Sequence, residues 1–115
     1  MDRDDAALFR RDPRADAQFA VRVILPGDEL VIEASAIDVS AGGMRLAMGI
    51  DLPAARNVIL RFTLPDELTE RMVRARVVLS FYDAALMLFV HGLAFTQFAV
   101  DDRDAISAYV AAQDA

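Results

Sequence analysis

The sequence predicts a mainly β fold: a small six-stranded antiparallel barrel or sandwich, followed by one C-terminal α-helix. Five segments alternate apolar and polar residues with a period of two, as half-buried strands do, and a sixth at 85–96 is an apolar, strand-like run. Turn-forming residues separate them about every 8–14 residues, a spacing typical of small all-β domains. Near the C-terminus the period becomes helical. A chain of 115 residues is expected to form a single domain with a real core.

The first three predicted strands precede residue 50 and are defined by their apolar faces. They span residues 18–25, 30–38 and 43–48. Their apolar faces are Val21, Val23 and Leu25; then Leu30, Ile32, Ala34 and Ala36; then Met44, Leu46 and Met48. The stretch Pro-Gly-Asp-Glu at 26–29 separates the first two strands and is a turn signal.

The second half of the predicted barrel follows the same rule. Its strands span residues 57–64, 71–82 and 85–96. The first two carry apolar faces of Val58, Leu60, Phe62 and Leu64, and of Val73, Ala75, Val77, Leu79 and Phe81. Apolar residues on the opposite faces, namely Ile59, Met72 and Val78, are candidates for a partner surface or for packing under another element.

Both ends of the chain depart from the strand pattern. Residues 101–113 place Ile106, Tyr109 and Val110 on one helical stripe, and aspartates in the first turn suit the helix dipole. We expect this helix to plug or flank the barrel. Residues 1–17 have no periodicity and are predicted to form an N-terminal arm, with residues 18–113 forming the barrel and helix.

Composition excludes several classes of function. The net charge of −6 argues against a nucleic-acid-binding surface, which usually needs a basic face. No apolar run approaches the roughly 18 residues of a membrane span, so no membrane insertion is expected. The N-terminus carries charges where a signal peptide would be apolar, and cysteine is absent. A cytoplasmic location is the default expectation.

The residues needed for catalysis are missing from the sequence. The single histidine, His91, lies in an apolar strand and is interpreted as structural. No cluster has zinc-ligand spacing, no serine sits in a nucleophile elbow, and no phosphate-binding loop is present. We therefore expect no enzyme activity, no metal and no cofactor.

The stretch RRDPRAD at 10–16 concentrates positive charge in an acidic chain. Arg10 and Arg14 are separated by three residues. One of the three is Pro13, which stiffens the loop. One interpretation is a solvated charged arm. The other is an anion clamp, because guanidinium groups grip phosphates and read the O6/N7 edge of guanine.

A second stretch, DVSAGG at 38–43, also has two interpretations. It can be a strand end and turn, in which Asp and Ser bond nearby backbone and glycine relaxes the chain. Alternatively it is a shelf for a ligand. Asp38 would accept hydrogen bonds from N1–H and N2–H₂ of a guanine, Ser40 would add a hydroxyl contact, and Gly43 would let the ligand approach the backbone.

Together, in this order and ahead of this barrel, the two stretches resemble the PilZ domain, a bacterial receptor module for cyclic di-GMP. The family pattern is Arg-x-x-x-Arg, then a strand, then Asp/Asn-x-Ser-x-x-Gly. The later strand Gly92-Leu93-Ala94-Phe95 also fits. The usual Ser-Pro-like helix start is replaced by Ala99-Val100-Asp101. The resemblance implies a six-stranded antiparallel PilZ-type β-barrel with a C-terminal α-helix.

The resemblance also implies a ligand site. Arg10 and Arg14 would grip guanine edges and phosphates, with Arg11 as an extra phosphate contact. Asp38 and Ser40 would hold a guanine, and Gly43 would give clearance.

The expected function is that of a cyclic di-GMP receptor or adaptor. The ligand would order the N-terminal arm, and an unidentified effector protein would read the change. One alternative is a PilZ fold that has lost the nucleotide and acts only as a protein–protein module. The other, a barrel that binds single-stranded nucleic acid, is disfavoured by the absence of Trp and by the acidic charge.

Overall fold

A computed structural model of the chain describes residues 15–113, in which seven strands precede one helix. The elements are β1 (Ala15–Asp16), β2 (Ala20–Leu25), β3 (Leu30–Ser40), β4 (Gly43–Met48), β5 (Asn57–Phe62), β6 (Arg71–Asp83), β7 (Leu88–Gln97) and α2 (Val100–Gln113). The six predicted strands and the predicted helix are all present. The two-residue β1 lies in the segment that was expected to belong to the arm.

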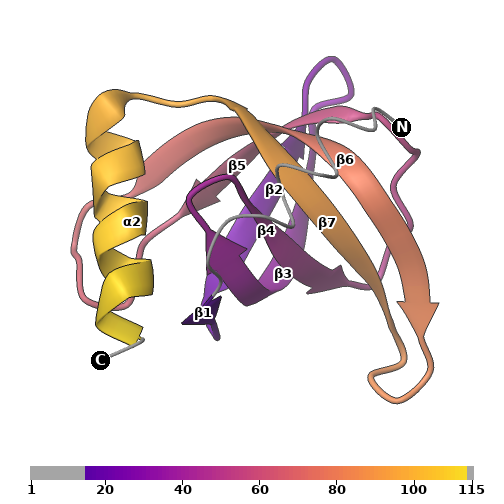
Figure 1. The fold of residues 1–115 in the computed structure, drawn as a ribbon. Helices are drawn as coiled ribbons and strands as arrows, with labels where there is room; N and C mark the ends of the chain where they lie inside the picture. Colours follow the sequence, from indigo (N-terminus) through magenta and orange to yellow (C-terminus); the bar gives the residue numbers. More distant parts are fainter. Residues whose placement is uncertain (1–14, 114–115) are drawn as a thin grey trace.

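Six of the strands close into an antiparallel barrel (Figure 1). The strand order is β1-β3-β2-β5-β6-β7-β4, and β4 pairs back with β3, which closes the ring. The long strand β3 has room for three partners. Residues 30–35 pair with β2, residues 38–39 pair with β1, and β4 takes the other edge. The predicted six-stranded barrel is therefore confirmed, with β1 as a short addition outside it.

The core fills the barrel and extends beneath the helix. Val21, Val23 and Leu60 are fully buried, as expected for a barrel too narrow to hold a channel. The predicted stripe of Ile106, Tyr109 and Val110 is buried. Helix α2 flanks the barrel, standing against one side of it (Figure 1).

Aromatic rings and a capping contact fix the position of α2. Phe19 meets Tyr109 edge-on, with ring centroids 6.1 Å apart, and lies 5.8 Å from Phe62. At the helix start, the backbone N–H of Ala99 donates to Asp102 Oδ2 at 3.3 Å. A carboxylate that reaches back in this way is one half of a capping box, so the helix has a cap although Ala99-Val100-Asp101 replaces a Ser-Pro-like start.

A buried arginine also anchors the helix start. Arg71, at the beginning of β6, is only 9% exposed. Its guanidinium donates to both carboxylate oxygens of Glu67 at 2.7 Å. It also reaches Asp102 at 2.9 Å and Asp101 at 3.3 Å. Three carboxylates thus compensate one buried cation and join α2 to the barrel.

The far half of β6 differs from the sequence prediction. The β6–β7 register shifts between Val77 and Leu79, and Val78 is 2% exposed. Leu79 and Phe81, predicted to face the core, are 37% and 42% exposed. The prediction that Leu79 and Phe81 face the core was wrong for two reasons. Val78 is an extra residue in β6 and interrupts the alternation, and the β6–β7 hairpin continues beyond the barrel (Figure 1). Val78, a candidate for a partner surface, is in fact buried.

Candidate functional site

A bulge in β3 decides which way Asp38 faces. The β3–β4 register shifts between Ala36 and Asp38. Ile32, Ala34 and Ala36 belong to the core, and after the shift the next core residue is Val39. Strict alternation from Ala36 would have sent Asp38 inward. The one extra residue instead turns Asp38 to the outer face of the barrel.

The outer face then carries a row of four residues from four neighbouring strands. Asp16 of β1 pairs with Asp38 of β3, Asp38 pairs with Arg45 of β4, and Arg45 pairs with Gly92 of β7. The neighbours of Arg45 in sequence, Met44 and Leu46, point into the core. Two carboxylates, one guanidinium and a residue without a side chain therefore lie side by side.

Arg45 holds Asp38 by a charge-assisted pair. Arg45 Nε donates to Asp38 Oδ2 at 2.7 Å, and Nη2 donates to the same oxygen. The side chain of Asp38 is 6% exposed and that of Arg45 is 37% exposed. The hydrogen bond to Asp38 is the main cause of the raised pKa of Arg45, and the charge of Asp16 adds to it. The buried carboxylate thus has a partly solvated cation as its partner.

Ser40 and Gly43 form the closing pair of the β3–β4 hairpin. The Ser40 hydroxyl donates to Gly43 O and accepts from Gly42 N–H, each at 3.3 Å. Ser40 is fully buried. The structure thus shows a turn here in which Ser40 bonds nearby backbone, whereas Asp38 bonds Arg45. The ligand roles of Ser40 and Gly43 stay predictions.

The predicted arginine clamp falls outside the described residues. This applies to Arg10, Arg11 and Arg14, which precede Ala15 in the chain. Among the described residues, Ala15 and Ala17 are buried and pack on the barrel. The backbone N–H of Ala17 donates to Ile37 O at 2.9 Å. The chain is thus anchored to the bulged part of β3 immediately after the arginine motif.

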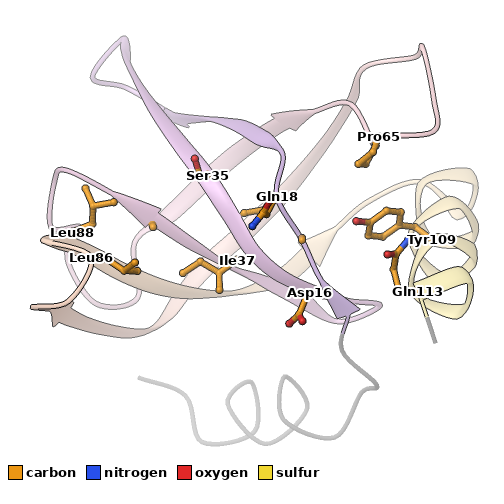
Figure 2. Close-up of a pocket in the computed structure, with 12 residues that line it drawn as sticks. Asp16, Gln18, Ser35, Ile37, Pro65, Leu86, Leu88, Tyr109 and Gln113 are labelled. Carbon is orange, nitrogen blue, oxygen red and sulfur yellow. The ribbon is translucent and has the colours of Figure 1, made fainter. Parts of the chain in front are cut away.

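A pocket of about 680 Å³ opens beside this row, a size common for small-molecule sites. Asp16 and Ile37 are among the residues that line it. Leu86 of the β6–β7 hairpin and Tyr109 of α2 stand at opposite sides (Figure 2). Asp38, Ser40 and Gly43 do not line it. The pocket therefore adjoins the predicted ligand residues and does not contain them.

His91 has a structural role. It is fully buried, and its Nε2 accepts from the backbone N–H of Leu52 at 2.9 Å. The same Nε2 lies 3.2 Å from Asp51 Oδ1, and burial lowers the pKa of His91 against the opposing effect of Asp51. The Ser80 hydroxyl donates to Asp51 Oδ1 at 2.8 Å and not to the histidine. Within residues 15–113, no acidic or histidine cluster is arranged to hold a metal ion.

Sequence reasoning missed two members of the row. Asp16 was assigned to the arm, because two strand residues are too few to give a period. Arg45 was not included among the predicted ligand residues. Its pairing with Asp38 follows from counting back along the hairpin from the turn at 41–42, since Ser40 faces Gly43 and Val39 faces Met44.

Comparisons with known proteins agree with this fold. The model of the PilZ domain family matches residues 9–112. No curated protein sequence matches the chain. No helix of the described part is long and apolar enough to cross a membrane.

Several solved structures share the architecture. The Bacillus subtilis inhibitor of motility, MotI/DgrA, aligns with a TM-score of 0.79 and 22% identity, over 91% of this chain and 51% of that one. The PilZ domain of Escherichia coli YcgR with c-di-GMP aligns with a TM-score of 0.69 and 12% identity, over 91% of each chain. The K. pneumonia MrkH complex with c-di-GMP aligns with a TM-score of 0.73 and 18% identity, over 89% of this chain and 51% of that one. This chain thus spans about half of MotI/DgrA and of MrkH.

The match of the family model extends from the arginine motif to the last turns of α2 and covers most of the chain. The solved structures share this fold over most of the chain. This chain belongs to the PilZ domain family.

Proposed function

We propose that this chain is a receptor for cyclic di-GMP and that its two polar motifs bind one ligand. The pairing of β1 with β3 is the observation that carries the proposal. Ala15 pairs with Val39, and Asp16 pairs with Asp38. Residues that follow one motif in the sequence are thereby held against the other motif.

Covalent geometry limits how far the arginines lie from Asp38. Arg14 is bonded to Ala15, and consecutive Cα atoms are about 3.8 Å apart. Arg10 precedes Arg14 by four residues, which span at most about 14 Å when extended. Both guanidinium groups are therefore within reach of a dinucleotide that contacts Asp38 and Ser40.

The chemistry of the two motifs fits the ligand. Cyclic di-GMP offers two phosphates and two guanines. Arg10, Arg11 and Arg14 supply forks for phosphates and for the O6/N7 edges. Asp38 accepts from guanine N1–H and N2–H₂, and Gly43 carries no side chain to obstruct the base. Two solved PilZ relatives contain c-di-GMP, which supports the same ligand here.

The receptor role requires a change that a partner protein can detect. We propose that the ligand orders the segment from about residue 9 to residue 14, next to the anchored β1. Fixing each backbone residue costs on the order of 1 kcal/mol, so several charge-assisted bonds to the ligand must offset it. An effector would then bind the ordered segment together with the adjoining pocket at Asp16 and Ile37.

Calorimetric titration with cyclic di-GMP tests the clamp. Arg14→Ala is expected to weaken binding by about 1–3 kcal/mol, since it removes a bidentate contact. Arg22→Ala is the matched control, because Arg22 lies on β2 and faces Glu33 at 3.5 Å. Equal affinity in wild type and Arg14→Ala would sink the clamp. Absence of binding in the wild type would favour the protein–protein module.

A second titration tests the role of Asp38. Cyclic di-AMP has no pair of adjacent donors to match one carboxylate, so it is expected to bind far more weakly than cyclic di-GMP. Asp38→Ala should reduce this preference. Equal binding of the two dinucleotides by the wild type would refute guanine recognition by Asp38.

A further inference from the structure

We infer that the far half of β6 is a docking edge for the same half of β6 in a second copy of this chain. β5 pairs with β6 only from Arg71 to Arg76, and Val77 bonds to the loop that precedes β5. From Leu79 to Asp83, β7 pairs with one side of β6. No strand within residues 15–113 pairs with the other side. The backbone groups on that side are therefore open to another strand.

The loop before β5 passes over the face of the β6–β7 hairpin. The Asp51 carboxylate accepts from the Ser80 hydroxyl and lies 3.2 Å from His91 Nε2. His91 belongs to β7 and pairs with Ser80, so this carboxylate lies over the face that the two strands share. The hairpin also continues beyond the barrel (Figure 1), away from the part of β6 that β5 pairs.

The strand at this edge is apolar, exposed and uncharged. The side chains of Leu79, Phe81 and Tyr82 are 37%, 42% and 53% exposed. No residue from 77 to 82 carries a charge, although the whole chain has a net charge of −6. Soluble proteins usually protect a free strand edge with charged residues, and an apolar edge without them pairs readily with another strand.

The edge can pair with itself across a two-fold axis. Such strands run antiparallel, and two residues directly opposite must both direct their backbone groups toward the partner or both direct them away. These directions alternate along a strand, so the axis has to lie beside a residue that faces its own copy.

Ser80 is the residue that suits this axis. An axis at Leu79 would pair Phe81 with Val77, whose backbone already bonds to the loop before β5. An axis at Phe81 would place the carboxylate of Asp83 against Leu79. With the axis at Ser80, Leu79 of each copy faces Phe81 of the other, and aliphatic–aromatic pairs across strands are favourable.

The ends of this pairing are complementary in charge. Asp83 of one copy comes opposite Val77 of the other, and the Val77 N–H donates to the backbone carbonyl of Arg56. An acidic residue therefore approaches a basic one, and the two-fold axis repeats the contact at the other end. Opposite charges at an interface favour the correct register.

The exposed apolar surface predicts a weak dimer. The hairpin tip adds Leu86 and Met87, which are 50% and 75% exposed. At about 200 Å² for a large side chain, these two and the three exposed strand residues present roughly 500 Å² per copy. A dimer that covers this surface buries roughly 1,000 Å², the lower limit for a specific interface.

The pairing would join the candidate ligand faces of two copies. Leu79 pairs with Gly92, which ends the row that starts at Asp16. Leu79 in turn faces Phe81 of the second copy, so the two rows lie on one continuous sheet. This consequence rests on the proposed function, whereas the pairing itself does not.

Sedimentation velocity of the whole chain without nucleotide tests the pairing. The wild type is expected to show a monomer–dimer equilibrium with a dissociation constant in the micromolar range. Phe81→Lys and Leu79→Glu are each expected to raise this constant at least about tenfold, because each places a charge on the edge. Met72→Lys is the matched control, since Met72 is 61% exposed in the half of β6 that β5 already pairs.

Mixing the two edge variants tests the register. In a mixed dimer the new lysine of one copy faces the new glutamate of the other, while the second pair of Leu79 and Phe81 stays intact. An equimolar mixture is therefore expected to associate more strongly than either variant alone. A mixture that associates no better than its components would overturn the register centred on Ser80.

Three results would overturn the docking edge. They are a wild type that stays monomeric up to about 1 mM, unchanged association of Phe81→Lys, and assembly into species larger than dimers. Circular dichroism checks that each variant is folded, and Tyr82→Lys replaces an edge variant that is not. Because no nucleotide is present, each of these results leaves the receptor proposal to its own titrations.

Discussion

Replacing Arg71 with alanine is expected to loosen α2 from the barrel and to lower the free energy of unfolding substantially. Arg71 is the central cation for three carboxylates, on Glu67, Asp101 and Asp102. Two of these carboxylates belong to the first turn of α2. The substitution removes the cation and leaves all three acids close together.

The magnitude depends on how exposed each carboxylate is. Breaking a fully buried ion pair costs about 3–5 kcal/mol. Here the side chains of Asp101, Glu67 and Asp102 are 89%, 25% and 15% exposed. Water can therefore solvate part of the charge that loses its partner. We expect Arg71→Ala to lower the free energy of unfolding by about 2 kcal/mol, which is less than for a fully buried ion pair and more than for an exposed one.

Urea unfolding measures this loss directly. The matched control is Arg61→Ala, because Arg61 and its partner Glu70 both have side chains 42% exposed, and exposed pairs contribute about 0–1 kcal/mol. Arg71→Ala should therefore be clearly less stable than Arg61→Ala. Equal stability of the two variants would refute the reasoning that burial makes the Arg71 network important.

The remaining predictions concern pH and the hairpin turn. Hydrogen bonds from Arg71 lower the pKa of Glu67 below its usual 4.5. The folded state is therefore stabilised by this pair above pH 4.5, and the stabilisation is lost as the pH falls further. In Arg71→Ala, the urea midpoint should depend less on pH across this range than in the wild type. Burial lowers the pKa of His91 below its usual 6.5, so the free energy of unfolding should fall as the pH drops below 6.5. His91→Gln should remove this pH dependence. An unchanged pH dependence in the variant would exclude His91 as its source. Ser40→Ala should cost about 1–2 kcal/mol by removing two turn hydrogen bonds, and an unchanged urea midpoint would contradict this.

The regular part of the fold could be predicted from the sequence because it depends on periodicity. Alternation such as Val21-Arg22-Val23 identifies a strand with one buried face, and that face is buried in the structure. The stripe of Ile106, Tyr109 and Val110 identified the buried face of α2 in the same way. Each pattern is long enough to show its own period.

The irregular part could not be predicted, because single residues create it. The bulges beside Ile37 and Val78 each insert one residue into a strand and leave no mark in composition. The bulge near Ile37 decides whether Asp38 faces the core or the outer surface. β1 is too short to show a period, yet its pairing with β3 brings the two polar motifs together.

The central claim is that both motifs bind the same molecule of ligand. An NMR titration of the whole chain with cyclic di-GMP tests it most directly, with Glu70 on the β5–β6 side as the reference. If both motifs bind one ligand molecule, the amide signals of residues 10–16 and 38–43 shift together along one saturable curve with a single dissociation constant, while the Glu70 signal does not move. Shifts confined to one motif, or different curves for the two motifs, would contradict binding of one ligand molecule by both motifs.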